Sequence, residues 1–381
     1  MAEAGEKIEI QRGLKGVYFD RSRVCFIDGR AGELRYRGYS IHDLAERSTF
    51  EESCYLILKG ELPTKAQLDS FTAELRAARR LPEPIYGMIE TLKTAHPMDV
   101  LRTVVSGLSA FDPETADKSP EATLRKGIRL TAQVPMIVAA HEHIRNGRAP
   151  VAPDPKLAHA ANFLYMLKGK APSPDAARLM DIDMVLHAEH GSNASSFAAR
   201  VVAGTDADLH GAITAAVAAL SGPAHGGAAE NVMRMAQEIG DAGRAADYVK
   251  TKRANGEPVM GFGHRVYRAE DPRARHMRAG VEKLSREMGQ PQWYQILEAV
   301  VAAMKPYARH GVNVNVDFYA GVVYFLNGIA EDLFVPIFAV GRVPGWTVQV
   351  LEQIENNILL RPLTLYNGPE PRDYVPLEKR G

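Results

Sequence analysis

Apolar residues recur at helical spacing along most of this 381-residue chain, and this periodicity restricts the fold more than any other feature. In HDLAERSTFEESCYLILKG, for example, Leu44, Phe50, Cys54 and Leu58 form stripes that end at Gly60. Comparable stripes predict helices at 64–79, 83–94, 97–111, 121–145, 155–168, 174–190, 194–203, 207–220, 227–239, 272–287, 292–304, 317–327, 330–340 and 344–356. Strand-like alternation is confined to the first 40 residues, and no βαβ alternation is found. The sequence therefore predicts a mainly α, multi-helical fold with minor N-terminal β hairpins.

The segments around 205–227 and 253–265 combine glycine, proline and polar residues between helices. Such segments are the best candidates for hinges. A chain of this length has room for two domains. We expect a large helical domain from residues 1–222 and 323–381, and a small helical domain from residues 223–322.

Charge and cysteine usage exclude several classes of protein. The chain has 46 basic and 46 acidic residues, so no overall field attracts nucleic acid or an anionic membrane. Its two cysteines, Cys25 and Cys54, are too few for a disulfide framework and are expected to be free thiols. The N-terminus lacks the apolar stretch of a signal peptide, and no run approaches the roughly 20 apolar residues of a membrane helix. We expect a cytoplasmic protein.

Two histidine motifs lie beside predicted helix ends. In HAEHGSN, which ends at Asn193, His187 and His190 are three residues apart and would share a helical face. They could hold zinc, hydrogen-bond a carboxylate or cap the helix, but zinc would need further ligands that the motif lacks. In SGPAHGG, His225 precedes a helix that begins near Gly226. The helix dipole would keep His225 neutral and a hydrogen-bond donor, unless it is simply a loop histidine.

A glycine-rich loop with several arginines follows, in VMGFGHRVYRAEDPR. It is not a dinucleotide-binding loop, because Val266 stands where the third glycine is required and no strand precedes it. The loop presents His264, followed by Arg265, Arg268 and Arg273. Closely spaced guanidinium groups suit carboxylate or phosphate recognition, although a solvated helix face would give the same pattern.

Asp317 in NVNVDFYAG precedes a strongly apolar helix. An aspartate at this place is a helix N-cap by default, and a general base if it is partly desolvated. Arg342 and Arg361 are single arginines near apolar helices, and each alone would be an ordinary surface or interface residue.

Taken together and in this order, these motifs resemble the citrate synthase family. The segment GFGHRVYRAEDPR matches the family signature, and SGPAHGG, HAEHGSN and NVDFYAG fall around it at the family's spacing. The resemblance extends from GLKGVYFD to LLRPLTLYNGP. It implies a mainly helical homodimer whose large domain forms the dimer interface and whose small domain closes over the substrates. The implied reaction is condensation of oxaloacetate with acetyl-CoA, followed by hydrolysis of citryl-CoA.

The resemblance also implies a role for each motif residue. His225 would hydrogen-bond the acetyl thioester oxygen, Asp317 would remove the methyl proton, and His264 would donate to the oxaloacetate carbonyl. The carboxylates of oxaloacetate and citrate would be held by His190, Arg273, Arg342 and, across the dimer interface, Arg361. CoA would be bound by Val259, Met260, Gly261, Phe262, Gly263 and Arg268. His187 and Asn193 are possible supporting residues.

Chemical reasoning agrees with these roles. A carboxylate alone cannot productively remove a thioester methyl proton, so the developing enolate needs a preorganised donor such as a neutral imidazole. Arginines would neutralise the carboxylates that otherwise repel the enolate. The reaction requires no metal and no cofactor, because acetyl-CoA is a co-substrate.

Some expectations remain open at the level of sequence. Val314 and Ala320 replace the proline and serine that family members often carry around the aspartate. Because the resemblance begins within about the first 14 residues, we expect no extra N-terminal domain and no NADH regulation through one. 2-Methylcitrate synthases share these motifs, and one methylene in an apolar pocket is worth only about 1–3 kcal/mol of discrimination. More distant alternatives are a metal-dependent hydrolase using His187, His190 and His210, or a non-catalytic helical dimer.

Overall fold

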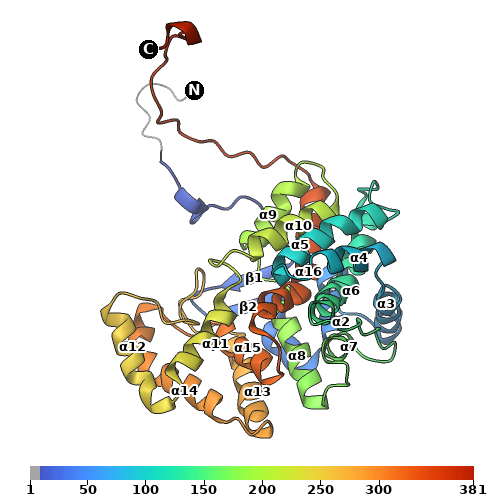
Figure 1. The fold of residues 1–381 in the computed structure, drawn as a ribbon, viewed down its shortest axis with the longest axis vertical. Coiled ribbons are helices and arrows are strands. Elements are labelled where there is room, and N and C mark those ends of the chain that lie inside the picture. Colours follow the sequence, from blue (N-terminus) through green and yellow to red (C-terminus); the bar gives the residue numbers. More distant parts are fainter. Residues whose placement is uncertain (1–8) are drawn as a thin grey trace.

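The computed structural model describes residues 9–381, and in that part of the chain helices dominate (Figure 1). The α-helices are α1 (Ile41–Arg47), α2 (Phe50–Lys59), α3 (Lys65–Ala77), α4 (Glu83–Thr91), α5 (Pro97–Leu108), α6 (Pro120–Arg145), α7 (His159–Lys168), α8 (Pro174–His187), α9 (Ala194–Ala203), α10 (Leu209–Leu220), α11 (Ala228–Ile239), α12 (Ala245–Ala254), α13 (Ala274–Glu287), α14 (Gln292–Met304), α15 (Asp317–Leu326) and α16 (Phe334–Glu355). Short 3₁₀ turns are η1 (Arg12–Leu14), η2 (Ser109–Phe111), η3 (Ala242–Arg244), η4 (Lys305–His310), η5 (Glu331–Leu333) and η6 (Leu377–Lys379). The predicted mainly α fold is confirmed.

A small antiparallel sheet carries the N-terminal strands β1 (Cys25–Asp28), β2 (Glu33–Tyr36) and β3 (Tyr39–Ser40). Cys25 pairs with Tyr36 and Asp28 with Glu33, so β1 and β2 form a hairpin. The turn of this hairpin contacts the arginine-rich loop, because the Arg268 N–H donates to the Gly29 carbonyl (2.7 Å). The N-terminal hairpin thus supports a loop that lies more than 200 residues later in the chain.

Helix α16 forms the centre of the fold. It packs against α2, α6, α8, α9 and α10, and its residues are buried almost continuously from Phe334 to Val350. The sequence predicted two helices here, broken before Pro344, but the structure has one. A proline inside a helix costs about 3 kcal/mol. Burial of apolar surface on every side of α16 outweighs that cost, since each fully buried large apolar side chain contributes about 1.5–3 kcal/mol.

The end of α8 is also different from the prediction. The helix stops at His187, so His190 lies in the following connection and does not share a helical face with His187. The Tyr36 hydroxyl donates to the Glu189 carbonyl (2.8 Å) and lies 3.2 Å from the carbonyl oxygens of Val185 and Leu186. A side chain from the sheet therefore meets the carbonyls that the helix end leaves free.

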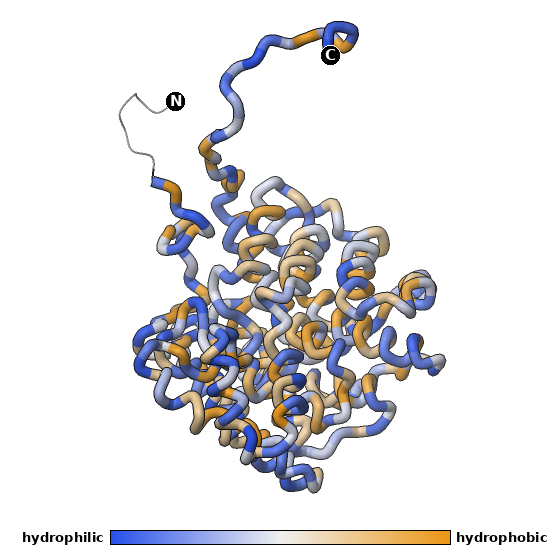
Figure 2. Tube along the Cα trace, turned by 60° about the vertical axis from the view of Figure 1, so that its left-hand side comes forward, coloured by the Kyte–Doolittle hydropathy of each residue, from blue (hydrophilic) through white to orange (hydrophobic). Residues whose placement is uncertain are grey.

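Helices α11 to α15 lie together at the lower left of Figure 1, where α15 packs on α11 and α13, and α14 on α12. Helix α12 was not predicted, because only Ala245 and Val249 of its ten residues are buried and its apolar stripe is short. The segment after α16 leaves the body as an extended arm, and the chain from residue 9, the first that the structure describes, projects from the same side before it reaches β1 (Figure 2).

One segment, Glu331–Glu355, has the length and mean hydropathy of a membrane-spanning helix, which the sequence analysis did not anticipate. In the fold, 94% of the apolar 18-residue window within this stretch is buried inside the protein. The apolar residues of this stretch therefore pack in the protein core around α16.

We expect Gly345→Ala to destabilise the protein by about 1–3 kcal/mol, the usual cost of overpacking. A Cβ at Gly345 would overlap with the Ala188 carbonyl oxygen and with Glu189 Oε2, and a backbone carbonyl cannot move aside as a flexible side chain can. Denaturant unfolding followed by circular dichroism measures the effect. Gly87→Ala in α4 is the matched control, because its Cβ meets nothing within 4 Å and alanine favours helix by up to about 1 kcal/mol. Equal stability of both variants would contradict this account of the α8–α16 contact.

Candidate active site

Five parts of the fold bring the sequence-predicted polar residues together. His190 lies in the connection between α8 and α9, His225 in the loop before α11, and His264 in the loop before α13. Asp317 begins α15, and Arg342 lies in the middle of α16. The rings of His190 and His264 are 5.3 Å apart. A second group of site residues surrounds the ring of Phe338 in α16.

Phe338 is in contact with three polar residues of the site. Its ring lies 4.8 Å from the ring of His187 and 6.3 Å from that of His225, and the Arg342 guanidinium lies 4.6 Å from it. One apolar residue of the central helix therefore spaces three polar groups. Phe338 was not predicted from the sequence, because nothing in an apolar helix distinguishes it from core residues.

The geometry around His264 fixes its tautomer. Its Nδ1 accepts the backbone N–H groups of Val266 (3.0 Å) and Tyr267 (3.2 Å). A nitrogen that accepts carries no proton, so neutral His264 holds its proton on Nε2. Burial, and next the nearby Arg273, lower the pKa of His264 to about 4. His264 is therefore a neutral Nε2–H donor at physiological pH.

His225 has the opposite tautomer. Its Nε2 lies 2.9 Å from Ser195 Oγ and accepts the Ser195 backbone N–H (3.3 Å) at the start of α9, which leaves the proton on Nδ1. Ser195 Oγ is itself held by Trp346 Nε1–H (3.0 Å) and donates to Asn193 Oδ1 (2.7 Å). Burial, and then Arg342, lower the pKa of His225 to about 4. The predicted neutral state is supported, but by these causes and not chiefly by the dipole of α11.

The two histidines of HAEHGSN have separate surroundings. His190 is buried, its Nε2 lies 3.1 Å from the Tyr267 hydroxyl, and burial followed by Arg273 holds its pKa well below the usual range. His187 contacts Asp183 through Nδ1, 2.9 Å from the carbonyl and 3.1 Å from Oδ1. Its Nε2 is buried and has no hydrogen bond among the described residues. Asn193, also predicted as a supporting residue, is the N-cap of α9.

The two buried arginines of the site, Arg273 and Arg342, differ in one important respect. Arg273 makes a bidentate ion pair with Asp271, with N–O distances of 2.9 and 2.7 Å. Arg342 is only 1% exposed and has no carboxylate within ion-pair distance in residues 9–381. Its Nε donates to the His187 carbonyl. Burial lowers the pKa of Arg342 to about 10, so it stays charged at neutral pH. An unpaired buried guanidinium is costly unless an anion binds it.

Asp317 is not a helix N-cap, contrary to the default prediction. It is the first residue of α15, Val316 holds the cap position, and no hydrogen bond in the described chain uses the Asp317 carboxylate. Burial raises the pKa of Asp317, although His187 and Arg273 oppose the shift. An unpartnered carboxylate of raised basicity is suited to accept a proton.

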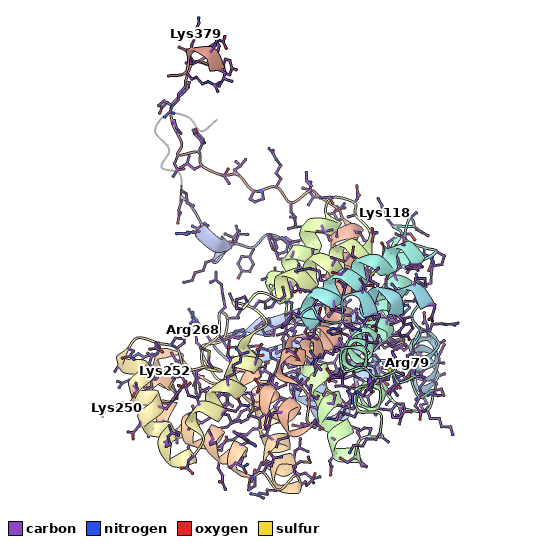
Figure 3. The ribbon with its side chains drawn as sticks, viewed as in Figure 1. Arg79, Lys118, Lys250, Lys252, Arg268 and Lys379 are labelled. Carbon is purple, nitrogen blue, oxygen red and sulfur yellow. The ribbon has the colours of Figure 1, made fainter. Side chains whose placement is uncertain are left out.

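The glycine loop runs antiparallel to the segment before α15. Phe262 bridges to Val314, the Gly263 N–H donates to the Asn313 carbonyl (2.8 Å), and Gly261 lies against Phe318. Val259 is buried and Met260 partly exposed. Arg268 is exposed and donates from Nη1 to the His264 carbonyl (3.1 Å), on the side of the molecule that also carries Lys250 and Lys252 (Figure 3).

Arg361 is exposed on the extended C-terminal arm and makes no ion pair or hydrogen bond within the described residues. A single chain therefore does not bring it to the site. His210 contacts Asp112 and Asp208, away from the other two histidines of the hydrolase alternative. In residues 9–381 no group of three or more His, Cys, Asp or Glu side chains is arranged to hold a metal ion.

Comparison with known proteins agrees with the motifs. Residues 13–363 match the family model described as "Citrate synthase, C-terminal domain". This chain belongs to the citrate synthase family. It is 44% identical over 373 residues to citrate synthase from Deinococcus radiodurans, covering 97% of this chain and 99% of that protein. It is 40% identical to 2-methylcitrate synthase 1 from Corynebacterium glutamicum, covering 98% and 99%.

Solved structures of the citrate synthase family share the fold. Citrate synthase from Pyrobaculum aerophilum matches with a TM-score of 0.93 and 40% identity, over 97% of this chain and 95% of that one. The ternary complex of the Thermoplasma acidophilum enzyme with carboxymethyl coenzyme A and oxaloacetate matches with a TM-score of 0.91 and 30% identity, over 98% and 100%. The protein is thus an enzyme, a transferase of the citrate synthase type.

Four further residues shape the site but were not identified from the sequence. Tyr267 and Asp271 lie inside the quoted signature. No pattern in the sequence indicates that Tyr267 contacts His190 or that Asp271 pairs with Arg273. Ser195 and Trp346 are 151 residues apart and meet only in the fold. Such pairings depend on helix packing and cannot be read from local spacing.

We expect nuclear magnetic resonance of histidine-labelled protein at pH 6 to show His264 protonated on Nε2 and His225 on Nδ1, both uncharged. Their folded pKa of about 4 lies below the ordinary value of about 6.5. The unfolded chain therefore binds more protons, and stability is lost as pH falls from about 6.5 to 4. A doubly protonated imidazole at either position at pH 6 would contradict the assignment. Ser195→Ala should alter the His225 signals and leave those of His264 unchanged.

Proposed function

We propose that this protein is a citrate synthase, which condenses acetyl-CoA with oxaloacetate through an enolate and hydrolyses citryl-CoA to citrate and CoA. The observation that carries the proposal is the buried, unpaired guanidinium of Arg342 in a site that also holds two neutral histidines of defined tautomer and an unpartnered aspartate. This set suits an anionic substrate and proton transfer at an adjacent carbon.

Proton abstraction from acetyl-CoA is assigned to Asp317, whose carboxylate has no competing hydrogen-bond partner in the described chain. The Nδ1–H of His225 then donates to the thioester oxygen as negative charge develops there. Because His225 is already neutral, it stabilises the enolate by donating a hydrogen bond, and it does not have to lose a proton to solvent beforehand. The Ser195 backbone N–H, which donates to Nε2, holds the His225 ring in this orientation.

Oxaloacetate is assigned to the Arg342 side of the site. Its carboxylates pair with Arg342, Arg273 and His190, and its carbonyl oxygen accepts from the Nε2–H of His264. Attack of the enolate carbon on that carbonyl forms the new bond, and His264 donates toward the developing alkoxide. Water then cleaves the citryl thioester. We assign no metal or resident cofactor to these steps.

CoA binding is assigned to the loop 259–263, whose backbone is held against residues 313–315, with Arg268 near the phosphates. Closure of residues 223–322 over the remaining large domain would exclude water from the enolate, with the glycine-containing segment 221–227 as one hinge. The boundaries of the two domains stay a prediction.

A homodimer is the proposed assembly. The arm after α16 exposes large apolar side chains, with Leu363 92% and Tyr374 80% exposed, and Tyr18 near the other terminus is 97% exposed. Exposed apolar groups gathered on projecting segments are typical of a surface covered by another chain. Arg361 lies on this arm, so it could complete the site of the second subunit. A cytoplasmic location is proposed because Cys25 and Cys54 are both free.

A second acyl specificity remains a candidate, because 2-methylcitrate synthases are nearly as similar to this chain as citrate synthases are. The two activities differ by one methylene of the acyl group, which a small change in pocket shape can accommodate. The preference between acetyl-CoA and propionyl-CoA therefore decides between them.

The experiment that tests the function follows CoA release with a thiol reagent, in the presence of oxaloacetate and either acetyl-CoA or propionyl-CoA. We expect faster release from acetyl-CoA, unaffected by a chelator. Asp317→Asn should reduce kcat at least about 100-fold, as expected for loss of a general base, while oxaloacetate binding is kept.

The outcomes separate the alternatives. A preference for propionyl-CoA assigns a 2-methylcitrate synthase, and loss of activity with chelator favours a metal-dependent enzyme. No release from either thioester contradicts both synthase assignments. Near wild-type turnover of Asp317→Asn removes Asp317 as the base.

Mixing two inactive variants tests the shared site. If Arg361 acts in the partner subunit, a heterodimer of Asp317→Asn and Arg361→Leu chains has one complete site out of two. Random reassociation makes about half of the dimers mixed, so activity should recover to about one quarter of wild type. If Arg361 acts within its own subunit, mixing restores nothing. If Arg361 has no role in the site, Arg361→Leu is active by itself before any mixing.

A further inference from the structure

Glu189 lies between the two histidines of HAEHGSN, yet the mechanism above does not use it. Its side chain is fully buried. Oε1 accepts the Gly191 backbone N–H (2.8 Å) and the Gln349 side-chain amide (2.8 Å), which ties the His190 connection to α16. Oε2 is buried and has no hydrogen-bond partner among the described residues. This carboxyl oxygen needs a proton or an ion pair.

The groups that face Glu189 come from α16 and the small sheet. Burial raises the pKa of Glu189 to about 7, and Arg342 is the strongest opposing influence, while Glu352 raises the pKa further. Glu189 also acts on Cys25 of β1 and on Arg37 after β2. Burial holds the Cys25 pKa well above its ordinary value, so this thiol stays neutral. Arg342 lies outside ion-pair distance of Glu189 but is its main counter-charge.

We propose that Glu189 is a positioning residue that takes up one proton from solvent, on Oε2, when the substrate dicarboxylate binds to Arg342. This inference rests on the proposed function. Without substrate, the charges of the buried Glu189 carboxylate and the buried Arg342 guanidinium partly balance each other. A bound carboxylate pairs with Arg342 directly, and two anions beside one buried cation repel each other. Protonation of Glu189 removes the excess negative charge and leaves the bonds to Oε1 in place.

The sign of the pH dependence follows from linkage. Below about pH 7 Glu189 is already protonated, and binding requires no proton. Above about pH 7 it is ionised, and each binding event takes up a proton, so oxaloacetate affinity falls by at most tenfold per pH unit. The pKa values of His225 and His264 are about 4 and that of His190 lies well below its ordinary value, so these histidines stay neutral in this window.

The test is titration calorimetry of oxaloacetate binding at pH 8 in buffers of different ionisation enthalpy, which counts the protons taken up. Wild type should take up a substantial fraction of one proton, and Glu189→Gln none. Because glutamine resembles the neutral acid, Glu189→Gln should bind oxaloacetate several-fold more tightly than wild type at pH 8.5 and equally at pH 6. A merely structural lesion would not improve affinity. Glu189→Asp keeps the titration and should keep the pH dependence.

Asp181→Asn is the matched control. Asp181, on α8, is another largely buried carboxyl, and burial raises its pKa to about 6. Its partners, Phe50 and Arg178, lie outside the site. This variant should retain wild-type proton uptake. The inference is overturned if wild type binds oxaloacetate without proton uptake, or if Glu189→Gln keeps the wild-type uptake and pH dependence. Failure of wild type to bind oxaloacetate at all would instead contradict the proposed function.

Discussion

The buried guanidinium of Arg342 is the interaction on which the rest of the site depends. A charge in the middle of the central helix is expensive to desolvate, and here its hydrogen bond goes to a backbone carbonyl, with no carboxylate within ion-pair distance in the described chain. The helix tolerates this because apolar packing along α16 supplies the stability. The result is a preformed site for an anion, ready before substrate arrives.

That positive charge also sets the protonation of its neighbours. Burial, with Arg342 or Arg273 nearby, keeps His190, His225 and His264 neutral, and the backbone N–H groups of Ser195, Val266 and Tyr267 choose which ring nitrogen of His225 and His264 carries the proton. Two histidines therefore become donors of opposite tautomer within one site. The same field restrains the Glu189 carboxyl, which would otherwise be protonated more readily.

Particular elements show where reasoning from sequence succeeded and where it did not. Helices α3, α9 and α14 were predicted almost residue for residue, because their apolar stripes are regular and their ends carry caps or prolines. The predicted helix break before Pro344 was wrong, because local propensity does not include the packing of the helices that surround α16. Asp317 was given a capping role by default, and only the fold moves the cap to Val316 and leaves the carboxylate free. Arg342 had an ordinary sequence context, and its burial depends on contacts with distant segments.

The sequence by itself determined the helical architecture, the family and the identity of the motif residues, since all three are recorded in local spacing and residue type. Only the tertiary structure decided which histidine nitrogen donates, which arginine is paired and which is not, and that Glu189 lies buried beside the anion site. Those properties arise from groups such as Ser195, Trp346, Asp271 and Gln349, which are brought together across long stretches of chain. Burial and hydrogen-bond partners, unlike periodicity, exist only after the helices have packed.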